Sequence, residues 1–436
     1  MSKSTVAFII VWSAIASIFS FLFEVDSLLI PFLFLISQSV FGILLVNKEN
    51  EAFYPQDIRV LFIVIYSLYS LFCPLISLLG FDVFLSTMPL TTFCFGLGLA
   101  GFNLGNILVP VKWTNITMIK TSVNYTLLLL LLLAELILLT AYLIAYQVPI
   151  FATLGQFDRL EFFETINQVW VVLTMAISLT SCLIIYYFDE WNKKQFIFGI
   201  LLIVYYITLQ LSLGNRRDFL PILLFSTSYL LTKYHSKLNA KVIIIGTVLF
   251  IGSFWLVQQR SNDLEYSRVG AIQESFVNNE FVYPMQTLAY VIDDKWDLRY
   301  GYTYFVLPFQ VAVPRYIYPD KPDDLGKEFV KRTFGEGSQG YAYTPVTEAY
   351  LNFGVLGPLF VFVFFSLFLS QFVRKFTEYG ISFVYFISYS FVFDFCRGTF
   401  ATVIYQVLVS LLFYFVIDKI AFVFYENIYF FVNLFG

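Results

Sequence analysis

The sequence predicts an all-α membrane protein that crosses the bilayer about twelve times, and two properties of the chain support this prediction. Of its 436 residues, 59% are hydrophobic and only 13% are charged, whereas soluble domains carry roughly 25% charged residues. A helix needs about 20 apolar residues to cross the hydrocarbon core of a bilayer. Many stretches of the chain reach that length, so we expect a polytopic membrane protein.

Apolar stretches separated by polar loops are the predicted spans. They cover residues 6–23, 27–46, 58–80, 86–109, 124–146, 167–188, 196–213, 218–233, 242–257, 351–373, 381–396 and 399–417. The end of the chain is also apolar, but Glu426 and two asparagines interrupt it, so we expect an interfacial helix there. The chain therefore divides into transmembrane helices over 1–257, a large loop over 258–350, further transmembrane helices over 351–417 and an interfacial tail over 418–436.

The basic residues of the short loops predict the orientation. Loops on the side of the N-terminus hold thirteen lysines and arginines, and short loops on the opposite side hold four. Lysine and arginine concentrate in the cytoplasmic loops of membrane proteins. We therefore expect both termini in the cytoplasm and the loop 258–350 on the outer face.

The loop 258–350 is predicted to be a folded cap made of short helices. It is mostly polar, but it contains many aromatic residues and the apolar run YTYFVLPFQVAV at 302–313. Disordered segments lack such residues. Long loops on compact proteins are usually functional or disordered, so this composition favours a functional cap.

Nine of the eleven arginines fall on the predicted outer face, where the positive-inside rule does not place them. A guanidinium offers a planar fork that binds phosphate or carboxylate through two parallel hydrogen bonds. The outer face is therefore predicted to hold an oxyanion. The nine arginines of the predicted outer face are Arg159, Arg216, Arg217, Arg260, Arg268, Arg299, Arg315, Arg332 and Arg397.

The stretch GNRRDFLPILL, which starts at residue 214, places two of these arginines at the beginning of a short predicted span. A helix N-terminus presents unsatisfied N–H groups and the positive end of a dipole. Arg216 and Arg217 are therefore candidate ligands of a diphosphate. In the alternative interpretation, Asp218 caps the helix and both arginines extend to water or lipid phosphate.

The stretch AVPRYIYPDKPDDLGKEF at 312–329 is the second candidate. Its prolines fix an extended, stiff turn that can hold Arg315 and Lys321 in one geometry. Its acidic residues offer an alternative, a divalent cation site, although their spacing matches no known cation-binding loop. They are Asp320, Asp323 and Asp324.

Two further residues stand at the ends of predicted outer loops. Glu348, in TPVTEAYLNFGVLGPL, precedes the span 351–373 and is a candidate general base or ligand of a sugar hydroxyl. Its alternative role is to complement the dipole of its own helix from the first turn. Arg397, in FCRGTF, lies in a tight outer turn, and an ion pair with Asp394 is its alternative role.

Several classes of site are absent from the sequence. It has no catalytic triad, nucleotide-binding loop or metal-ligand cluster, so no cofactor and no metal are expected. The net charge of −4 gives no reason to expect nucleic-acid binding. The single histidine, His235, falls in a predicted cytoplasmic loop, which argues against a histidine base on the outer face.

Taken in order, GNRRDFLPILL, VPRYIYPDKPDDLG, TPVTEAYLNFGVLGPL and CRG resemble the oligosaccharide repeat-unit polymerases, the Wzy-type O-antigen polymerases. The twelve spans and the large outer loop late in the chain add to the resemblance. It covers residues 200–400, and residues 1–190 resemble the family in hydropathy alone. The resemblance implies a fold similar to multispan lipid-dependent glycosyltransferases (GT-C-like), related to the O-antigen ligases.

The resemblance implies a glycosyltransferase of the bacterial inner membrane, acting at the periplasmic face in polysaccharide or lipopolysaccharide biosynthesis. Such enzymes transfer a glycan from undecaprenyl diphosphate to the non-reducing end of another lipid-linked repeat unit. The expected partners are this lipid-linked oligosaccharide, membrane lipids and a polysaccharide chain-length regulator. Arginines would stabilise the diphosphate leaving group. The candidates are Arg216, Arg217, Arg315 and Arg397, followed by Arg260, Arg268 and Lys321, with Glu348 and then Asp218 as the base.

The sequence departs from the family at two points. Arg217 stands where family members commonly have glycine or another small residue, which leaves open which of the two arginines meets the phosphate. Some relatives use a histidine in the outer loop, and this chain has none there. Ligases usually carry that histidine, so its absence favours a polymerase over the first alternative, an O-antigen ligase. Another polyprenyl-phosphate-dependent glycosyltransferase is a second alternative. A flippase for the same lipid-linked unit is the alternative outside the glycosyltransferases.

Overall fold

A computed structural model describes most of the chain, and the described residues are helical apart from loops and turns. The described ranges are 27–50, 54–81, 86–113, 117–120, 125–148, 168–213, 218–234, 281–313, 317–335 and 342–416. The predicted spans 6–23 and 242–257 and the tail 418–436 lie outside them. The all-α class predicted from the sequence is confirmed for this part of the chain.

Within the described ranges, seven helical segments are long and apolar enough to cross a membrane, as in a polytopic membrane protein. They are α2 (Leu29–Asn50), α3 (Ile58–Leu78), α4 (Met88–Leu108), α5 (Tyr125–Ala145), α7 (Gln168–Tyr186), α8 (Lys193–Ser212) and the segment Pro345–Tyr379. This last segment consists of α16 (Pro345–Phe353), a 3₁₀ turn and α17 (Gly357–Tyr379). The sequence prediction started this span at residue 351 and missed its first turns.

Other predicted spans appear as shorter helices. The stretch 218–233 forms α9 (Leu220–Lys233), and 399–417 forms the apolar helix Phe400–Val416. The stretch 381–396 is broken into α18 (Phe383–Ser390) and α19 (Val392–Arg397). At the break, the Ser390 hydroxyl donates to the Ile387 carbonyl at 2.7 Å, a side-chain bond that competes with the helical ladder.

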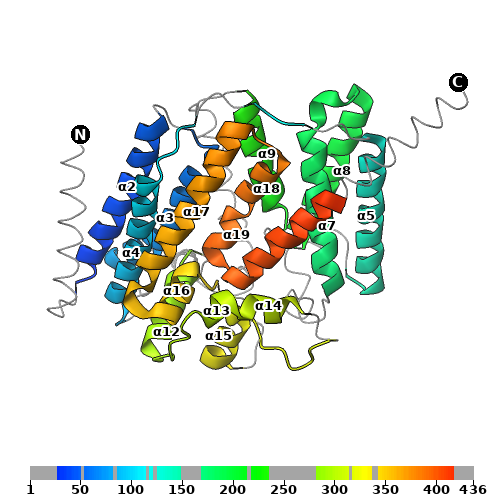
Figure 1. The fold of residues 1–436 in the computed structure, drawn as a ribbon. Helices are drawn as coiled ribbons and strands as arrows, with labels where there is room; N and C mark the ends of the chain where they lie inside the picture. The colour runs from blue at the N-terminus through cyan, green and yellow to red at the C-terminus, as the bar shows by residue number, and fades with distance from the viewer. Residues whose placement is uncertain are drawn as a thin grey trace, which may run out of the picture. The chain divides into compact units, whose positions relative to one another are not determined.

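The chain forms two compact units, and each is described by itself. Unit 1 comprises Met1–Ile116, Lys237–Tyr379 and Val392–Tyr405, and unit 2 comprises Thr117–Ser236, Gly380–Phe391 and Gln406–Gly436. In unit 1, α4 packs between α2 and α17 (Figure 1). A Cβ at Gly101 would lie 2.2 Å from the Leu359 carbonyl oxygen, and one at Gly105 would lie 2.5 Å from the Ser366 Cβ. These glycines let the α4 and α17 backbones approach closely.

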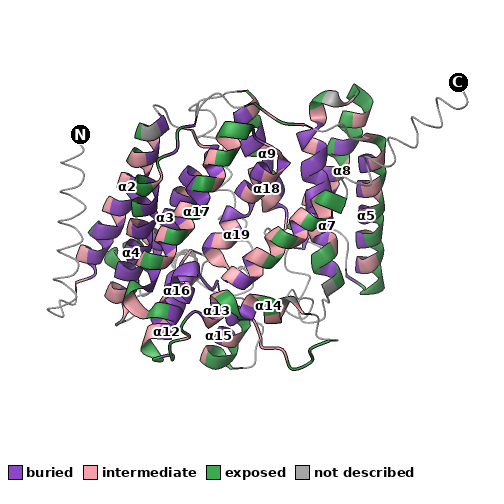
Figure 2. Cartoon of the chain, in the orientation of Figure 1, coloured by how far each residue is buried: buried purple, intermediate pink, exposed green. Residues whose placement is uncertain are grey.

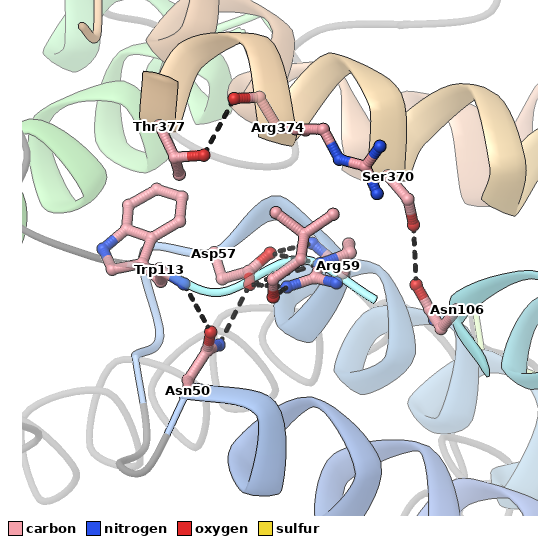
Figure 3. A network of polar contacts seen from close by, with 9 residues as sticks. Asn50, Asp57, Arg59, Asn106, Trp113, Ser370, Arg374 and Thr377 are labelled. Carbon is pink, nitrogen blue, oxygen red and sulfur yellow. Dashed lines mark hydrogen bonds and ion pairs between the residues drawn. The ribbon is translucent and has the colours of Figure 1, made fainter. Parts of the chain in front are cut away.

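A fully buried ion pair stands at the N-terminus of α3 in unit 1 (Figure 3). The Arg59 guanidinium donates to the Asp57 carboxylate at 2.7 Å and to the Val111 carbonyl at 3.0 Å. Asn50, from the end of α2, donates to Asp57 and accepts the Trp113 backbone N–H at 2.7 Å. The network therefore holds the loop after α4 against the ends of α2 and α3.

The described part of the predicted cap also belongs to unit 1 and consists of short helices. Before α16 come α12 (Tyr283–Asp293), α13 (Tyr302–Phe305), α14 (Leu307–Ala312) and α15 (Leu325–Phe334). Their shared core includes Val291, Trp296, Leu307, Phe329, Tyr343 and Leu351. In Figure 2, α16 is coloured almost entirely as buried, so the polar side chains on this helix are enclosed by protein.

In unit 2, α5 packs on α7 and α9 packs on α18. The segment around Met118 pairs with Ile381 in an isolated parallel bridge. An exposed charge cluster follows α7, where Asp189 accepts hydrogen bonds from Lys120, at 3.2 Å, and from Lys233. Burial alone would raise the pKa of the Asp189 carboxyl, but these two lysines lower it below its ordinary value.

Candidate functional site

The structure describes four of the nine predicted site residues. Glu348, Lys321 and Arg397 belong to unit 1, and Asp218 belongs to unit 2. The remaining five lie outside the described residues. They are Arg216, Arg217, Arg260, Arg268 and Arg315.

Glu348 is fully buried on α16, and its carboxylate serves a different helix from its own. Its Oε2 atom accepts the backbone N–H of Phe400 at 2.7 Å, where the helix Phe400–Val416 begins. Its Oε1 atom has no hydrogen-bond partner among the described residues, although the Thr303 hydroxyl lies close by. The N-terminus of α16 itself is capped by Thr344, which accepts the Thr347 N–H.

Two buried phenols accompany this carboxylate. The hydroxyls of Tyr304 and Tyr343 have no hydrogen-bond partner in the described part of the chain. Burial first, and then the negative charge of Glu348, raise the pKa of both phenols well above its ordinary value. Both phenols therefore keep their protons at neutral pH and can donate. Buried polar atoms are normally satisfied by protein, water or ligand, so this group has unused capacity to bind a polar molecule.

Asn352 holds the local backbone around the group. It lies one helical turn after Glu348, so both side chains project from the same face of α16. Its Oδ1 atom accepts the Gly301 backbone N–H at 2.8 Å, and its Nδ2 atom donates to Thr303 Oγ1 at 2.6 Å. Gly301 has a positive φ of 87°, a conformation that favours glycine. The amide thus ties α16 to the start of α13, the helix that carries Tyr304.

Aromatic rings surround the Tyr304 side chain. Its ring stacks on Phe353 with centroids 6.3 Å apart and meets the edge of Phe400 at 5.2 Å. Glu348, Tyr304 and Tyr343 are called the carboxylate–phenol cluster below. A carboxylate acceptor and two phenol donors beside aromatic rings suit a ligand that carries hydroxyl groups.

Arg397 ends α19, two residues before Thr399, and is partly exposed. Its guanidinium lies 5.7 Å from the centre of the Phe393 ring. Residue Phe400, which the Glu348 carboxylate holds, follows three positions later. The structure therefore brings two sequence-predicted residues, Arg397 and Glu348, to the same turn of unit 1.

Lys321 has a structural role in the cap. Its ammonium donates to the carbonyls of Val311 and Val313, each at 2.9 Å, at the C-terminal end of α14. A cation at this end complements the helix dipole. These two bonds tie Lys321 to the end of α14 and engage the ammonium that was a candidate for diphosphate binding.

Asp218 precedes α9, and its backbone carbonyl is held by two hydroxyl groups. Its carbonyl accepts the Ser178 hydroxyl at 2.8 Å and the Tyr206 hydroxyl at 3.5 Å. Phe219 stands between Asp218 and the first residue of α9, and its side chain makes no cap bond. Ser178 and Tyr206 nonetheless fix the backbone that directly follows Arg217 in the sequence.

The acidic residues of the proline-rich turn do not assemble a metal site. No group of three or more histidine, cysteine or acidic side chains suited to a metal occurs among the described residues. Asp324 instead caps the N-terminus of α15 by accepting the Gly326 N–H at 2.9 Å. It also accepts the Thr399 hydroxyl at 3.4 Å, next to the turn that carries Arg397.

Sequence reasoning missed Tyr304, Tyr343 and the linking role of Asn352. The spacing of Glu348 and Asn352 on one helical face was an available signal, whereas the tyrosines stand among many other aromatic residues.

No protein-family model, no curated protein and no solved structure matches the chain significantly.

Proposed function

We propose that this chain is a polymerase of lipid-linked oligosaccharide repeat units at the outer face of the bacterial inner membrane. The observation that carries the proposal is the buried carboxylate–phenol cluster beside the turn of Arg397. A transferase acting on a sugar diphosphate needs a site that binds the hydroxyl groups of a sugar and an arginine that can bind the diphosphate. The order of the four motifs, from GNRRDFLPILL to CRG, adds support from the sequence.

The proposed reaction transfers the growing glycan from undecaprenyl diphosphate to the non-reducing end of another lipid-linked unit. The acceptor hydroxyl oxygen forms a bond to the anomeric carbon while the bond between that carbon and the diphosphate oxygen breaks. The departing diphosphate takes the bonding electron pair, and the hydroxyl proton passes to a base. Glu348 is the proposed base because its carboxylate is buried beside the two phenols, and Asp218 is the second candidate.

Arginine side chains are proposed to stabilise the negative charge on the departing diphosphate. Arg397 is the described candidate, and Arg216, Arg217, Arg315, Arg260 and Arg268 are proposed from the sequence. Removing one such preorganised donor typically lowers the rate by about 10²–10³-fold. The reaction uses no metal in this proposal because the guanidinium groups supply the positive charge.

A polysaccharide ladder tests the proposal. The native strain, a deletion strain and strains complemented with Arg397→Ala or Glu348→Gln are compared on a gel. Arg332→Ala is the matched control, because Arg332 stacks over Trp296 in the cap and lies outside the proposed site. We expect the deletion and both site variants to leave a core with one repeat unit and no ladder, while the control keeps the ladder.

Other outcomes of the same gel separate the alternatives. A ladder that survives the deletion contradicts the polymerase proposal. Loss of the single-repeat band as well as the ladder points instead to an O-antigen ligase or a flippase. Immunoblots of membrane fractions confirm that each variant reaches the membrane at the native level.

A further inference from the structure

The turn between α19 and the helix Phe400–Val416 fixes the backbone of Arg397. Only Gly398 and Thr399 separate the arginine from the helix start. A Cβ at Gly398 would lie 2.8 Å from the Asp394 carbonyl oxygen, so the chain packs closely here. Any shift of the helix start therefore moves the arginine.

Thr399 organises the N-terminus of this helix. Its Oγ1 atom accepts the Thr402 backbone N–H at 3.3 Å and lies 2.8 Å from the Thr402 hydroxyl oxygen. Its carbonyl accepts the Val403 N–H at 3.1 Å, the first bond of the helical ladder. This is the bonding pattern of an N-cap residue.

Two carboxylates, one from the cap and one from α16, hold the same turn. Asp324 accepts the Thr399 hydroxyl at 3.4 Å, and Glu348 accepts the Phe400 N–H at 2.7 Å. Asp324 is itself fixed, because it caps α15, and α15 contributes Phe329 to the cap core. Negative charge is also favourable at the N-termini of both helices. A continuous chain of contacts therefore runs from the cap core through Asp324 and Thr399 to the turn.

We infer that Asp324 and Thr399 are positioning residues for Arg397, which they orient through the turn 397–400. The inference rests on the proposed function for its catalytic meaning, but the geometry it describes can be measured without any activity. A displacement of about 1 Å in a group that stabilises a transition state can lower the rate roughly 100-fold. The cap thus determines where the arginine stands.

Hydrogen exchange and arginine modification on the purified full-length protein test the inference directly. Thr399→Val and Asp324→Ala are compared with Thr399→Ser, which keeps the hydroxyl. In Thr399→Val we expect exchange of the Phe400 and Thr402 amides to speed up roughly fivefold or more, the effect of losing a helix cap. Asp324→Ala removes the acceptor of the Thr399 hydroxyl, so we expect the same amides to exchange faster in this variant too. We also expect faster phenylglyoxal modification of Arg397, with Arg332 as the unchanged internal control. Thr399→Ser should restore both values.

The polymer assay then measures coupling to Arg397. Thr399→Val should lower turnover in the native background and change it by less than about twofold when Arg397 is already alanine. Unchanged exchange, unchanged Arg397 modification or losses that multiply in the double variant overturn the inference. Absence of polymer from the native protein would reject the proposed function, while the exchange and modification results would still decide whether these residues position Arg397.

Discussion

The Glu348 carboxylate accepts the Phe400 backbone N–H at 2.7 Å, joining two helix segments that lie 52 residues apart in the chain. Glu348→Ala leaves that N–H without its acceptor, and an unsatisfied buried donor costs about 1–3 kcal/mol. Glu348→Gln keeps an acceptor oxygen, so we expect it to lose less than half as much. Chemical denaturation of the purified protein measures both. Equal losses would contradict the role of this bond in stability, and polymer formation by Glu348→Gln would contradict its role as base.

The Tyr343 hydroxyl is predicted to lower the stability of the unliganded protein and to contribute to polymer formation. Its buried hydroxyl has no partner among the described residues, so Tyr343→Phe removes an unsatisfied polar group. We expect the unliganded variant to be about 1 kcal/mol more stable, or at least unchanged, while polymer formation falls. Tyr385→Phe, on α18, serves as a control for expression and handling. A loss of stability in Tyr343→Phe would show that the hydroxyl is already satisfied in the resting protein.

Arg59 and Asp57 form an ion pair that is fully buried on both sides. Arg59→Met leaves the Asp57 charge uncompensated, and we expect a loss of about 3–5 kcal/mol in the free energy of unfolding. The double variant Asp57→Ala/Arg59→Met should lose less than the sum of the single variants. Arg374→Met is the matched control, because Arg374 donates to Pro110 in the same loop from a more exposed position. Equal losses in Arg59→Met and Arg374→Met would reject the argument from burial.

Gly101 is predicted to be intolerant of a side chain. A Cβ there would lie 2.2 Å from the Leu359 carbonyl oxygen, a backbone atom that cannot rotate away. We expect Gly101→Ala to cost about 1–3 kcal/mol through overpacking. At Gly326, the nearest atom to an added Cβ is 3.6 Å away, so Gly326→Ala should be neutral or stabilising. Thermal unfolding in detergent compares them, and an unchanged Gly101→Ala would contradict the close approach of α4 and α17.

The stability of the folded protein is predicted to depend on pH through the Asp189 carboxyl. Its lysine partners lower the pKa of its carboxyl from the ordinary value of 3.8, so the unfolded chain takes up the proton more readily. The stabilisation is therefore complete above about pH 4 and is lost as the pH falls through the lowered value. Melting temperatures between pH 3 and pH 7 should show that Asp189→Asn is less stable than the native protein at pH 6 and that the difference shrinks toward pH 3. A difference that grows on acidification would contradict this sign.

The long apolar helices were predictable because hydropathy and length depend on neighbouring residues alone. The predicted ranges for α2, α3, α4 and α5 agree with the observed helices to within a few residues. The break at Phe391 was missed because an apolar stretch of 16 residues satisfies the same criteria whether or not its ladder is interrupted. Side-chain competition at Ser390 becomes visible only with coordinates.

The candidate site was predictable in part. Arg397 and Glu348 were identified because a charged residue at the end of an apolar span is conspicuous. Their meeting at one turn depends on tertiary contacts across 52 residues, and no local pattern encodes such contacts. The role of Lys321 was missed for the same reason. Its charge suggested that it binds an anion, but its ammonium donates to two nearby backbone carbonyls.

The glycine face of α4 has a consequence for biosynthesis. Its partner α17 begins at Gly357, about 250 residues after Gly105. At roughly 5–20 residues per second, the ribosome takes between about 10 and 50 s to supply that partner. During this interval the glycine surface of α4 that later contacts α17 lacks this partner. The order of translation therefore makes α17 the helix that closes this part of unit 1.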